Sequence, residues 1–421
     1  MSNWGSLKAG VPQGSVLGPL LFLIFINDIT HNIKSNIKLF ADDTMIFTEV
    51  KNPINAAKML NDDLNTIYNW SKKWLVQFNA TKSVALTISR KVNKQTHPKL
   101  YLNNTEIKQF DSHKHLGITF SSNGQWQKHI DTISKKANKR LNILRNFKYN
   151  LDRTSLQQLY FAYVRPVLEY GSIIWDNCHD FESEIIERIQ LEAAKLVTGA
   201  VKGTKHKLLY AETQWPTLQK RREIQKIIQI DKMVKNEAPD FLTSLVTILP
   251  DTNHNLRNRT NKINLQPIFA HTNLYYDSFL PSAIRLWNAL NNTTKNETVK
   301  IVKNILTKKE KPPSYYNCTD RKSQILHARL RLECSNLNLH LTQRFLSDDP
   351  HCKCGKYLET PEHYLMKCIL FTDIRSNTID KLPYDININT LLFGSSKYNL
   401  ETNIEIFRAV GEFILKSKRF T

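Results

Sequence analysis

Two adjacent acidic residues, Asp42 and Asp43, lie between two short apolar segments of this 421-residue chain, and they restrict its fold more than any other feature. Leu39 and Phe40 precede the pair and residues 45–47 follow it, a pattern that predicts two strands joined by a tight turn. Adjacent carboxylates among apolar side chains repel each other and lose hydration, so the pair favours a divalent metal bound through oxygen. A solvated turn without a function is the alternative interpretation.

A segment rich in glycine and proline precedes the acidic pair. It reads Ala9-Gly-Val-Pro-Gln-Gly-Ser-Val-Leu-Gly-Pro19 and is followed by an apolar run over residues 20–26. Glycine allows backbone conformations that bring the chain close to a ligand, and proline stiffens the turn. We therefore expect a loop that contacts a ligand and leads into a buried helix.

These two segments, in this order and at this spacing, resemble the palm of a reverse transcriptase of the jockey-like non-LTR retrotransposons. The resemblance implies an RNA-directed DNA polymerase, in which a primer 3′-hydroxyl attacks the α-phosphorus of a nucleotide by a two-metal mechanism. It also implies an RNA template, a DNA primer and deoxynucleoside triphosphates as partners, with Mg²⁺ or Mn²⁺ as the cofactor at the palm.

The same resemblance assigns roles to individual residues. It makes Asp42 a magnesium ligand and Asp43 a weaker or supporting one. The residues it places against the nucleotide and the template are Gln13, Gly14, Ser15 and Phe40. Phe40 stands where a tyrosine is common, so an aromatic ring is retained. Lys82 stands where the family carries a lysine near the triphosphate, and an ordinary exposed lysine is the alternative.

The palm of this family also needs an earlier strand that carries a further Asp. No acidic residue precedes Asp28 in this sequence. Because two metal ions must be clamped to stabilise both the attacking and the leaving oxygen, we expect the chain alone to be inactive. Two other interpretations stay open: a noncatalytic nucleic-acid-binding remnant of a retrotransposon, and a zinc-binding interaction protein.

The charge of the chain favours a nucleic-acid partner. The sequence has 59 Lys and Arg against 38 Asp and Glu, a formal net charge of +21, which favours binding of a polyphosphate through counterion release. Residues 113–149 predict a short strand followed by an amphipathic helix with a basic outer face. The nucleic-acid-binding candidates on that face are Lys128, Lys135, Lys136, Lys139 and Arg140. A merely solvated basic face is the alternative.

Helical periodicity dominates the remaining sequence. Apolar residues recur at helical spacing over residues 55–74, which puts Asp62 and Asp63 on the solvated side of that helix. The region after the basic helix also predicts helices, with a linker at residues 288–313, where the composition cannot bury much surface. A basic stripe follows at residues 326–332.

Four soft metal ligands fall close together near the C-terminus: Cys352, Cys354, His363 and Cys368. Together they can form a closed tetrahedral zinc site with no open position for a reactant. His351 is an alternative ligand, because the Cys-x-Cys spacing is unusually tight. The C-terminal knuckle of non-LTR retrotransposon proteins resembles this segment, including its Glu-Thr-x-x-His element. Free buried thiols are the alternative.

Together these patterns predict an α+β protein with a partial reverse-transcriptase palm, a mainly helical thumb-like and middle region, and a small zinc-knuckle-like C-terminal domain. The predicted boundaries are 1–90 for the partial palm, 91–150 for its end and the basic thumb-like helix, 151–310 for the helical post-polymerase region and 311–421 for the C-terminal domain. No signal peptide or membrane span is expected. Six cysteines do not suggest a secreted disulfide framework, so we expect a nuclear or cytoplasmic protein without a membrane partner.

Overall fold

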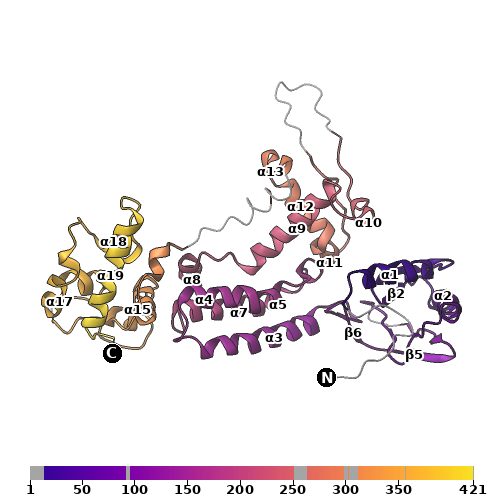
Figure 1. Ribbon diagram of the computed structural model, residues 1–421, viewed down its shortest axis with the longest axis horizontal. Helices are drawn as coiled ribbons and strands as arrows, with labels where there is room; N and C mark the ends of the chain where they lie inside the picture. Colours follow the sequence, from indigo (N-terminus) through magenta and orange to yellow (C-terminus); the bar gives the residue numbers. More distant parts are fainter. Residues whose placement is uncertain are drawn as a thin grey trace. The chain divides into compact units, whose positions relative to one another are not determined.

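The computed structural model describes residues 14–91, 95–250, 263–297, 302, 312–355 and 357–420 (Figure 1). The chain forms two compact units, Met1–Lys128 and His129–Thr421, and each is described by itself. The first unit mixes strands with helices and the second is mainly helical, which confirms a mixed helix-and-sheet architecture. In the described part of the chain, no helix combines the length and the apolar composition that crossing a membrane requires. The four predicted domain ranges stay predictions.

The first unit contains short strands in small sheets, together with two longer helices. Strand β1 pairs with β2, β5 lies between β3 and β4, and β6 pairs with β7. The described elements are α1 (Leu17–Ile26), η1 (Asn27–Thr30), β1 (Asn36–Phe40), β2 (Asp43–Phe47), α2 (Pro53–Lys73), β3 (Val84–Ala85), β4 (Leu100–Leu102), β5 (Thr105–Gln109), β6 (Ser112–His115) and β7 (Ile118–Ser121).

The β1–β2 hairpin carries the acidic pair at its tip. Its antiparallel register pairs Phe40 with Asp43, so Ala41 and Asp42 alone form the connection. Ala41 has a positive φ of 51°, as tight two-residue connections between twisted strands require. The inward face of the hairpin packs against α1, η1 and α2 through Phe22, Ile26, Ile29, Ile37, Leu39, Ile46 and Ile67. The predicted pair of strands around an acidic turn is confirmed.

The helix predicted at residues 55–74 is confirmed as α2, but Asp63 does not lie on its solvated side. The Asp63 residue is 1% exposed, and its carboxylate accepts hydrogen bonds from the backbone N–H groups of Lys34 at 2.9 Å and Ser35 at 2.8 Å. Burial alone would raise the pKa of Asp63, but these hydrogen bonds outweigh it and hold the pKa below its ordinary value. Asp63 therefore fixes the segment that enters β1, whereas Asp62 is exposed as expected.

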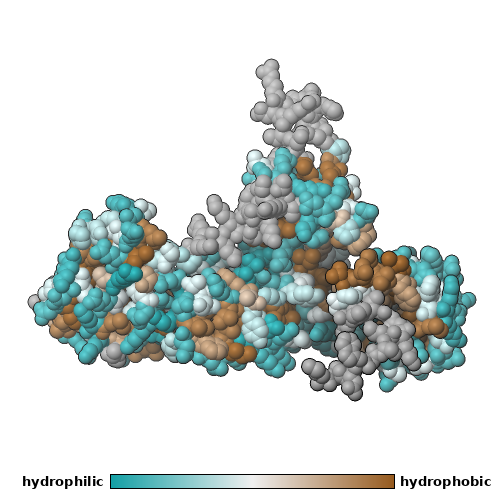
Figure 2. All heavy atoms as spheres, in the orientation of Figure 1, coloured by the Kyte–Doolittle hydropathy of each residue, from teal (hydrophilic) through white to brown (hydrophobic). Residues whose placement is uncertain are grey.

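Helix α1, which follows the glycine-rich loop, is not buried as expected. Of its residues, all of which are described, Ile26 alone is buried, and Leu20, Leu23 and Ile24 are 53%, 54% and 66% exposed. The helix is almost entirely apolar, but the hairpin and α2 cover only one side of it, so the other sides face outward. Figure 2 shows this apolar surface over α1. Exposed apolar surfaces of this kind are typical of contact surfaces for another segment or protein.

A hairpin replaces the single short strand predicted before the basic helix. Strands β6 and β7 pair in antiparallel fashion with His115 opposite Ile118, and the connection consists of Leu116 and Gly117. Both connecting residues have positive φ, a conformation that glycine adopts without strain. The basic helix itself is confirmed as α3 (Gln127–Asn146), and its apolar face buries Ile130, Ile133, Ala137, Leu141 and Leu144.

The middle of the second unit is helical, as predicted. Its core lies between α9 and α12, where Ile227, Ile230 and Trp287 are buried together. The described elements after α3 are α4 (Arg153–Leu159), η2 (Tyr160–Val164), α5 (Arg165–Glu169), α6 (Ser172–Trp175), α7 (Asp180–Thr198), α8 (His206–Thr213), α9 (Leu218–Val234), α10 (Asp240–Thr243), α11 (Asn273–Asp277), α12 (Phe279–Asn288) and α13 (Asn292–Asn296).

The first part of the predicted linker is packed, which contradicts the expectation for residues 288–297. The Asn288 side chain bonds both the N–H and the C=O of Leu265, at 2.9 Å each. Lys295 is 1% exposed, and its Nζ donates to Asn264 at 3.0 Å. Specific amide contacts thus bury a segment whose composition looked unable to pack. Residues 298–301 and 303–311 of the predicted linker lie outside the described part of the chain.

The C-terminal part of the second unit packs around helix α19. The large side chains of its core include Tyr364, Phe407 and Phe413. Its described elements are η3 (Ser314–Asn317), α15 (Arg321–Arg331), α16 (Asn338–Thr342), η4 (His363–Lys367), η5 (Ile369–Phe371), α17 (Thr372–Ser376), η6 (Ile379–Lys381), α18 (Ile388–Phe393) and α19 (Leu400–Lys416).

The basic stripe at residues 326–332 belongs to α15 and faces the protein interior. His327 bonds a backbone carbonyl of α18 at 2.9 Å, and burial lowers the pKa of His327 to about 3. Arg329 donates to the carbonyl of Gly199, the residue that ends α7, at 2.8 Å. A Cβ at Gly199 would lie 2.6 Å from Ile325, so glycine is needed for α15 to approach this closely. Arg331 is 5% exposed.

A buried ionic cluster joins the C-terminal part to the helical middle. Glu212 of α8 lies between Arg153 of α4 and Arg331 of α15, and each of the three side chains is at most 4% exposed. Arg153 Nη1 donates to Glu212 Oε1 at 2.5 Å, while Arg331 donates from Nε at 2.9 Å and from Nη2 at 2.6 Å. The Arg331 guanidinium also lies 3.9 Å from the centroid of the Tyr316 ring.

Replacing Glu212 by Gln should strongly destabilise the second unit. Gln keeps the size of the side chain but leaves two buried guanidinium groups without a counter-charge, a loss that typically costs about 3–5 kcal/mol of unfolding free energy. Glu333→Gln is the matched control, because the Glu333–Lys205 pair is exposed and exposed pairs contribute little. Urea unfolding of the full chain, followed by tryptophan fluorescence, measures both variants. Equal losses in the two would contradict this role of Glu212.

The pH dependence of the Glu212→Gln variant gives a second readout. Burial alone would raise the pKa of Glu212, but Arg331 and Arg153 outweigh it and lower the pKa from 4.5 to about 2. Because the folded pKa is the lower one, this stabilisation is fully present above the unfolded value and is lost as the pH falls toward the folded value. Between about pH 4.5 and 2, the melting temperature of the unmodified chain should therefore fall more steeply than that of Glu212→Gln.

Candidate functional site

The tip of the β1–β2 hairpin presents both members of the acidic pair to solvent. Asp42 lies in the two-residue connection and Asp43 begins β2, and both residues are exposed. Phe40, which pairs with Asp43 across the hairpin, is 63% exposed. The hairpin thus offers carboxylate oxygens, the ligands that Mg²⁺ prefers, on a backbone whose geometry is fixed by strand pairing.

Two carboxylates do not complete a two-metal site. Within residues 14–128, apart from the gap at 92–94, no third His, Cys, Asp or Glu side chain joins Asp42 and Asp43 in a group that could hold a metal. Asp28 accepts hydrogen bonds from the indole N–H groups of Trp70 at 2.7 Å and Trp74 at 3.1 Å, so its carboxylate has a structural role. The described residues therefore provide the two carboxylates of the acidic turn, but not the further ligands that a two-metal site needs.

The other candidates of the first unit lie in loops around the same core. Gln13 lies outside the described residues. Gly14 has a φ of 86°, and Ser15 Oγ accepts a hydrogen bond at 3.1 Å from a backbone N–H at the start of α1. Lys82 is exposed in the turn before β3. The contacts of these residues with a nucleotide or a template stay predictions.

The basic side chains predicted to bind nucleic acid line α3. Lys135, Lys136 and Lys139 are exposed. Lys128 Nζ donates to a serine hydroxyl of β6 at 3.2 Å. Arg140 differs from the lysines, because its guanidinium is held against η2, the neighbouring helical turn. Binding of nucleic acid by this face stays a prediction.

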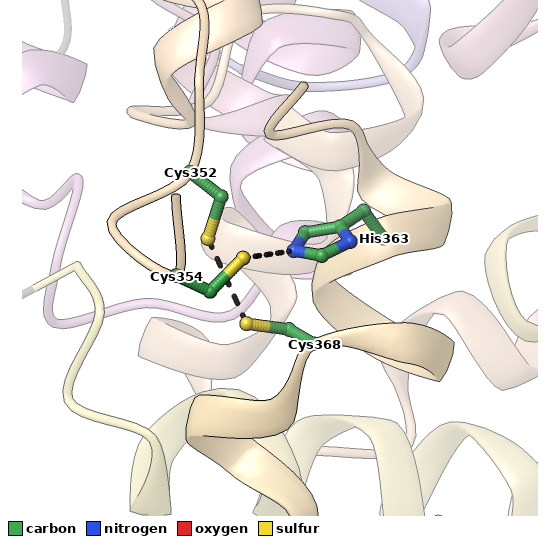
Figure 3. Close-up of side chains that lie close together, drawn as sticks. All are labelled: Cys352, Cys354, His363 and Cys368. Atoms are coloured by element: carbon green, nitrogen blue, oxygen red, sulfur yellow. Dashed lines mark hydrogen bonds between the residues drawn. The ribbon is translucent and has the colours of Figure 1, made fainter. Parts of the chain in front are cut away.

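Four metal-ligating side chains converge in the C-terminal part: Cys352, Cys354, His363 and Cys368 (Figure 3). Their ligand atoms all lie within 4.8 Å of one another. The sulfurs of Cys352 and Cys368 are 3.6 Å apart, and the Cys354 sulfur lies 3.3 Å from His363 Nε2. The structure therefore brings together the cluster that the sequence predicted.

This spacing fits a tetrahedral metal and not a disulfide. Zinc–sulfur bonds of about 2.3 Å at tetrahedral angles separate two sulfurs by about 3.8 Å, whereas bonded sulfurs lie about 2.05 Å apart. The six cysteines all lie within the described residues, and none of them forms a disulfide. Three sulfurs and one imidazole nitrogen are also a ligand set typical of structural zinc, so the residues fit that ion.

Tight turns on both sides of the cluster position its ligands. The Cys352 N–H donates to the Tyr357 carbonyl at 2.9 Å, and Gly355, with a φ of 79°, reverses the chain after Cys354. The π-helical turn η4 begins at His363 and is followed by Cys368, whose N–H donates to the His363 carbonyl at 2.7 Å. Two sulfurs thus come from one loop, and the other two ligands come from the ends of one helical turn.

Burial sets the protonation states of the cluster. It raises the pKa of the Cys352 thiol to about 12 and lowers the pKa of the His363 imidazole. A neutral imidazole is ready to bind a metal, whereas the thiols would release protons on binding. Arg375 donates to the Cys368 carbonyl at 3.3 Å and so places a cation beside a site that becomes rich in thiolate.

His351, the alternative ligand, is not part of the cluster. Its side chain is 58% exposed, and its Nδ1 lies 2.8 Å from a carboxylate oxygen of Asp349. Because η4 brings His363 to the three sulfurs, the fourth position is taken without His351. The sequence spacing left His351 open as an alternative ligand, and the position of η4 favours His363 instead.

A buried ion pair next to the cluster is not predicted by the sequence. Glu359 is 1% exposed and accepts hydrogen bonds from Arg419 at 2.7 and 2.6 Å and from the Asn338 N–H at 2.6 Å. The Asn338 side chain donates to the His351 carbonyl at 2.5 Å. This network ties the last residues of the chain to the strand that enters the cluster. The Glu-Thr-x-x-His element contains Glu359, but nothing local in the sequence identifies Arg419 as its partner.

Comparison with known proteins identifies related sequences. The reverse transcriptase (RNA-dependent DNA polymerase) family matches residues 5–140. A probable RNA-directed DNA polymerase from transposon X-element of Drosophila melanogaster is 28% identical over 211 residues, which cover 47% of this chain and 23% of the relative. The RNA-directed DNA polymerase from mobile element jockey of the same organism is 26% identical over 255 residues, which cover 57% of this chain and 26% of the relative.

A third relative gives the same picture. A probable RNA-directed DNA polymerase from transposon BS of Drosophila melanogaster is 27% identical over 212 residues, 47% of this chain and 23% of the relative. The matched part spans about a quarter of the length of the curated relatives.

Removing the Arg419 side chain should lower the stability of the C-terminal part. Arg419→Ala leaves the buried Glu359 carboxylate without its counter-charge, so we expect a loss of about 3 kcal/mol in unfolding free energy. Lys416→Ala is the matched control, because Lys416 forms an exposed pair with Glu412, four residues earlier in the chain. Thermal unfolding and limited proteolysis of the C-terminal segment measure the effect. If Arg419→Ala behaves like Lys416→Ala, the pair does not hold this segment.

Proposed function

The chain belongs to the jockey-like reverse transcriptases of non-LTR retrotransposons, and from this premise we propose that it supplies the acidic turn of an RNA-directed DNA polymerase. The β1–β2 hairpin carries the proposal, because it holds Asp42 and Asp43 at its tip within the segment that the family matches. The intact polymerase would join the primer 3′-oxygen to the α-phosphorus of a deoxynucleoside triphosphate and release pyrophosphate, with RNA as the template.

Each candidate residue has a role in this proposal. Asp42 holds Mg²⁺ or Mn²⁺ through a carboxylate oxygen, and Asp43 supports it. When bound, such ions supply positive charge that stabilises the attacking and leaving oxygens. Lys82 offsets the charge of the triphosphate or protonates the departing pyrophosphate. The residues that contact the nucleotide and the template are Gln13, Gly14, Ser15 and Phe40.

The chain by itself would bind nucleic acid without extending a primer. The absence of a third metal-holding side chain beside Asp42 and Asp43 among residues 14–91 and 95–128 supports this part of the proposal. So does the exposed apolar surface of α1, which a further palm segment could cover. The net charge of +21 and the basic face of α3 favour binding of RNA and DNA, and we propose a nuclear or cytoplasmic location where both are present.

Primer extension tests the polymerase proposal. The purified 421-residue chain should bind an RNA template annealed to a DNA primer, but it should not extend the primer with deoxynucleoside triphosphates and Mg²⁺ or Mn²⁺. A fusion that adds the upstream palm segment of the jockey polymerase should extend it. In that fusion, Asp42→Asn should lower the rate by about a hundred-fold or more, because the neutral amide is a poor magnesium ligand.

Asp62→Asn is the matched control, since Asp62 is an exposed acid on α2 and not on the hairpin. It should leave the rate of the fusion unchanged. If the 421-residue chain extends primers and Asp42→Asn abolishes the activity, the proposed inactivity of the isolated chain is wrong. A fusion whose rate does not respond to Asp42→Asn would refute the catalytic role of the hairpin.

We also propose that the C-terminal cluster of Cys352, Cys354, His363 and Cys368 binds one structural Zn²⁺. Four protein ligands leave no position for a reactant, so the ion would stabilise the fold and take no part in catalysis. The spacing of the ligand atoms and the soft donor set support zinc. Because a preformed site rarely exists in an unfolded chain, its binding energy would add to the stability of the C-terminal part.

Metal analysis of the purified chain tests this second proposal. The chain should carry one equivalent of zinc, and both Cys368→Ser and His363→Ala should lose it and unfold at a lower temperature, because each removes a ligand. Two matched controls should keep the ion: Cys318→Ser, a free cysteine outside the cluster, and His351→Ala. Retention of zinc by His363→Ala together with loss by His351→Ala would overturn the proposed ligand set.

A further inference from the structure

Arg140 and Tyr163 form a stacked pair on the surface of the second unit. The guanidinium carbon of Arg140 lies 4.4 Å from the centroid of the Tyr163 ring, and Arg140 Nη1 donates to the Tyr163 carbonyl at 2.5 Å. Tyr163 remains 40% exposed. Arg140, which the sequence predicts to bind nucleic acid, is therefore held against the Tyr163 ring. This contact orients the ring.

The π-helical turn η2 explains why this ring faces outward. Tyr160 and Val164 at the two ends of the turn are completely buried, and the Tyr160 hydroxyl donates to Gln190 at 2.9 Å. With both ends anchored inward, Tyr163 of the same turn points to the surface. Isolated π-helical turns occur often at functional sites, because they shift one residue out of the regular helical register.

The stacked pair continues the basic face of α3. Lys136, Arg140, Ile143 and Phe147 follow one another at spacings of four, three and four residues, so they lie along one line of the helix and the turn after it. Ile143 is 48% exposed and Phe147 is 45% exposed. Lys135 and Lys139 are exposed beside this line. Along this line the basic side chains of Lys136 and Arg140 are thus followed by the exposed apolar and aromatic side chains of Ile143 and Phe147.

A single strand of nucleic acid matches both halves of this surface. Its phosphates complement clustered lysines, and its unpaired bases can stack on exposed aromatic rings. In a duplex the bases are stacked on each other and only the backbone and grooves are accessible, so exposed rings on the protein would gain little. An acidic protein partner would satisfy the lysines but offers no stacking partner for the rings.

We propose that Tyr163 and Phe147 stack unpaired bases of a single strand whose phosphates contact Lys135, Lys136 and Lys139. Arg140 is a positioning residue, because it fixes the Tyr163 ring and so reduces the entropy lost on binding. This inference rests on the proposed function of α3 as a nucleic-acid-binding face and deepens it by naming the bound form, single-stranded RNA or DNA such as the unpaired part of a template.

Fluorescence anisotropy with the full chain tests the inference. The probes are labelled oligo(U) and oligo(dT) and an RNA–DNA duplex of the same length, each titrated over a series of salt concentrations. Tyr163→Ala and Phe147→Ala should each weaken single-strand binding about ten-fold, leave the slope of affinity against salt unchanged and leave duplex binding unchanged. Tyr163→Phe should retain the affinity, because the ring that stacks is kept.

Tyr276→Ala is a closely matched control. Tyr276 is 48% exposed, Arg285 lies 3.4 Å from its ring centroid, and Arg285 also donates to its carbonyl at 2.8 Å, but this pair is formed by α11 and α12 and not by α3. Tyr276→Ala should not change single-strand binding. Circular dichroism establishes that each variant is folded, and Phe147→Ala provides an independent test if Tyr163→Ala does not fold.

The lysines separate failure of this inference from failure of the proposed function. Lys136→Gln and Lys139→Gln should each reduce the salt slope by about one for every type of probe, since each removes one phosphate contact. If they do so and neither Tyr163→Ala nor Phe147→Ala weakens single-strand binding, the stacking site is refuted and the basic face stands. The stacking site is also refuted if the aromatic variants weaken duplex binding equally. If the lysine variants have no effect, both the basic face and the stacking site are refuted.

Discussion

The carboxylate of Glu212, buried between Arg153 and Arg331, is the contact on which the second unit depends. A buried carboxylate without a counter-charge would cost several kcal/mol, so α4, α8 and α15 are stable together only in the arrangement that brings both arginines to Glu212. Helix α15 then packs on α18 and α19, whose core supports the Cys/His cluster. The position of the Cys/His cluster therefore depends, through α15, on an ionic contact made elsewhere in the unit.

Buried acids recur at the junctions of this basic chain. Asp63 fixes the entry to β1 through two backbone N–H groups, and Glu359 fixes the last residues of the chain beside the Cys/His cluster. In each case several hydrogen bonds compensate for lost hydration, as buried charges require. With 38 acids against 59 basic residues, placing acids in the interior also leaves an excess of lysine on the surface.

The two candidate sites follow opposite principles. The acidic hairpin is exposed and offers hard oxygen ligands, so it can act only when further groups close around it. The Cys/His cluster is largely buried and brings all four of its soft ligands together within one part of the chain. The proposed functions match this difference in exposure and in completeness, because catalysis needs an open position for a substrate and a structural metal does not.

The sequence by itself determined the features that depend on neighbouring residues: the acidic hairpin, the helices α2 and α3, and the four side chains of the Cys/His cluster. It was wrong about α1, about Asp63 and about the start of the linker. The sequence did not predict the Glu359–Arg419 pair. Periodicity shows which residues share a face, but it does not show what covers that face. Only the tertiary structure decided which charges are buried, because their partners come from distant segments.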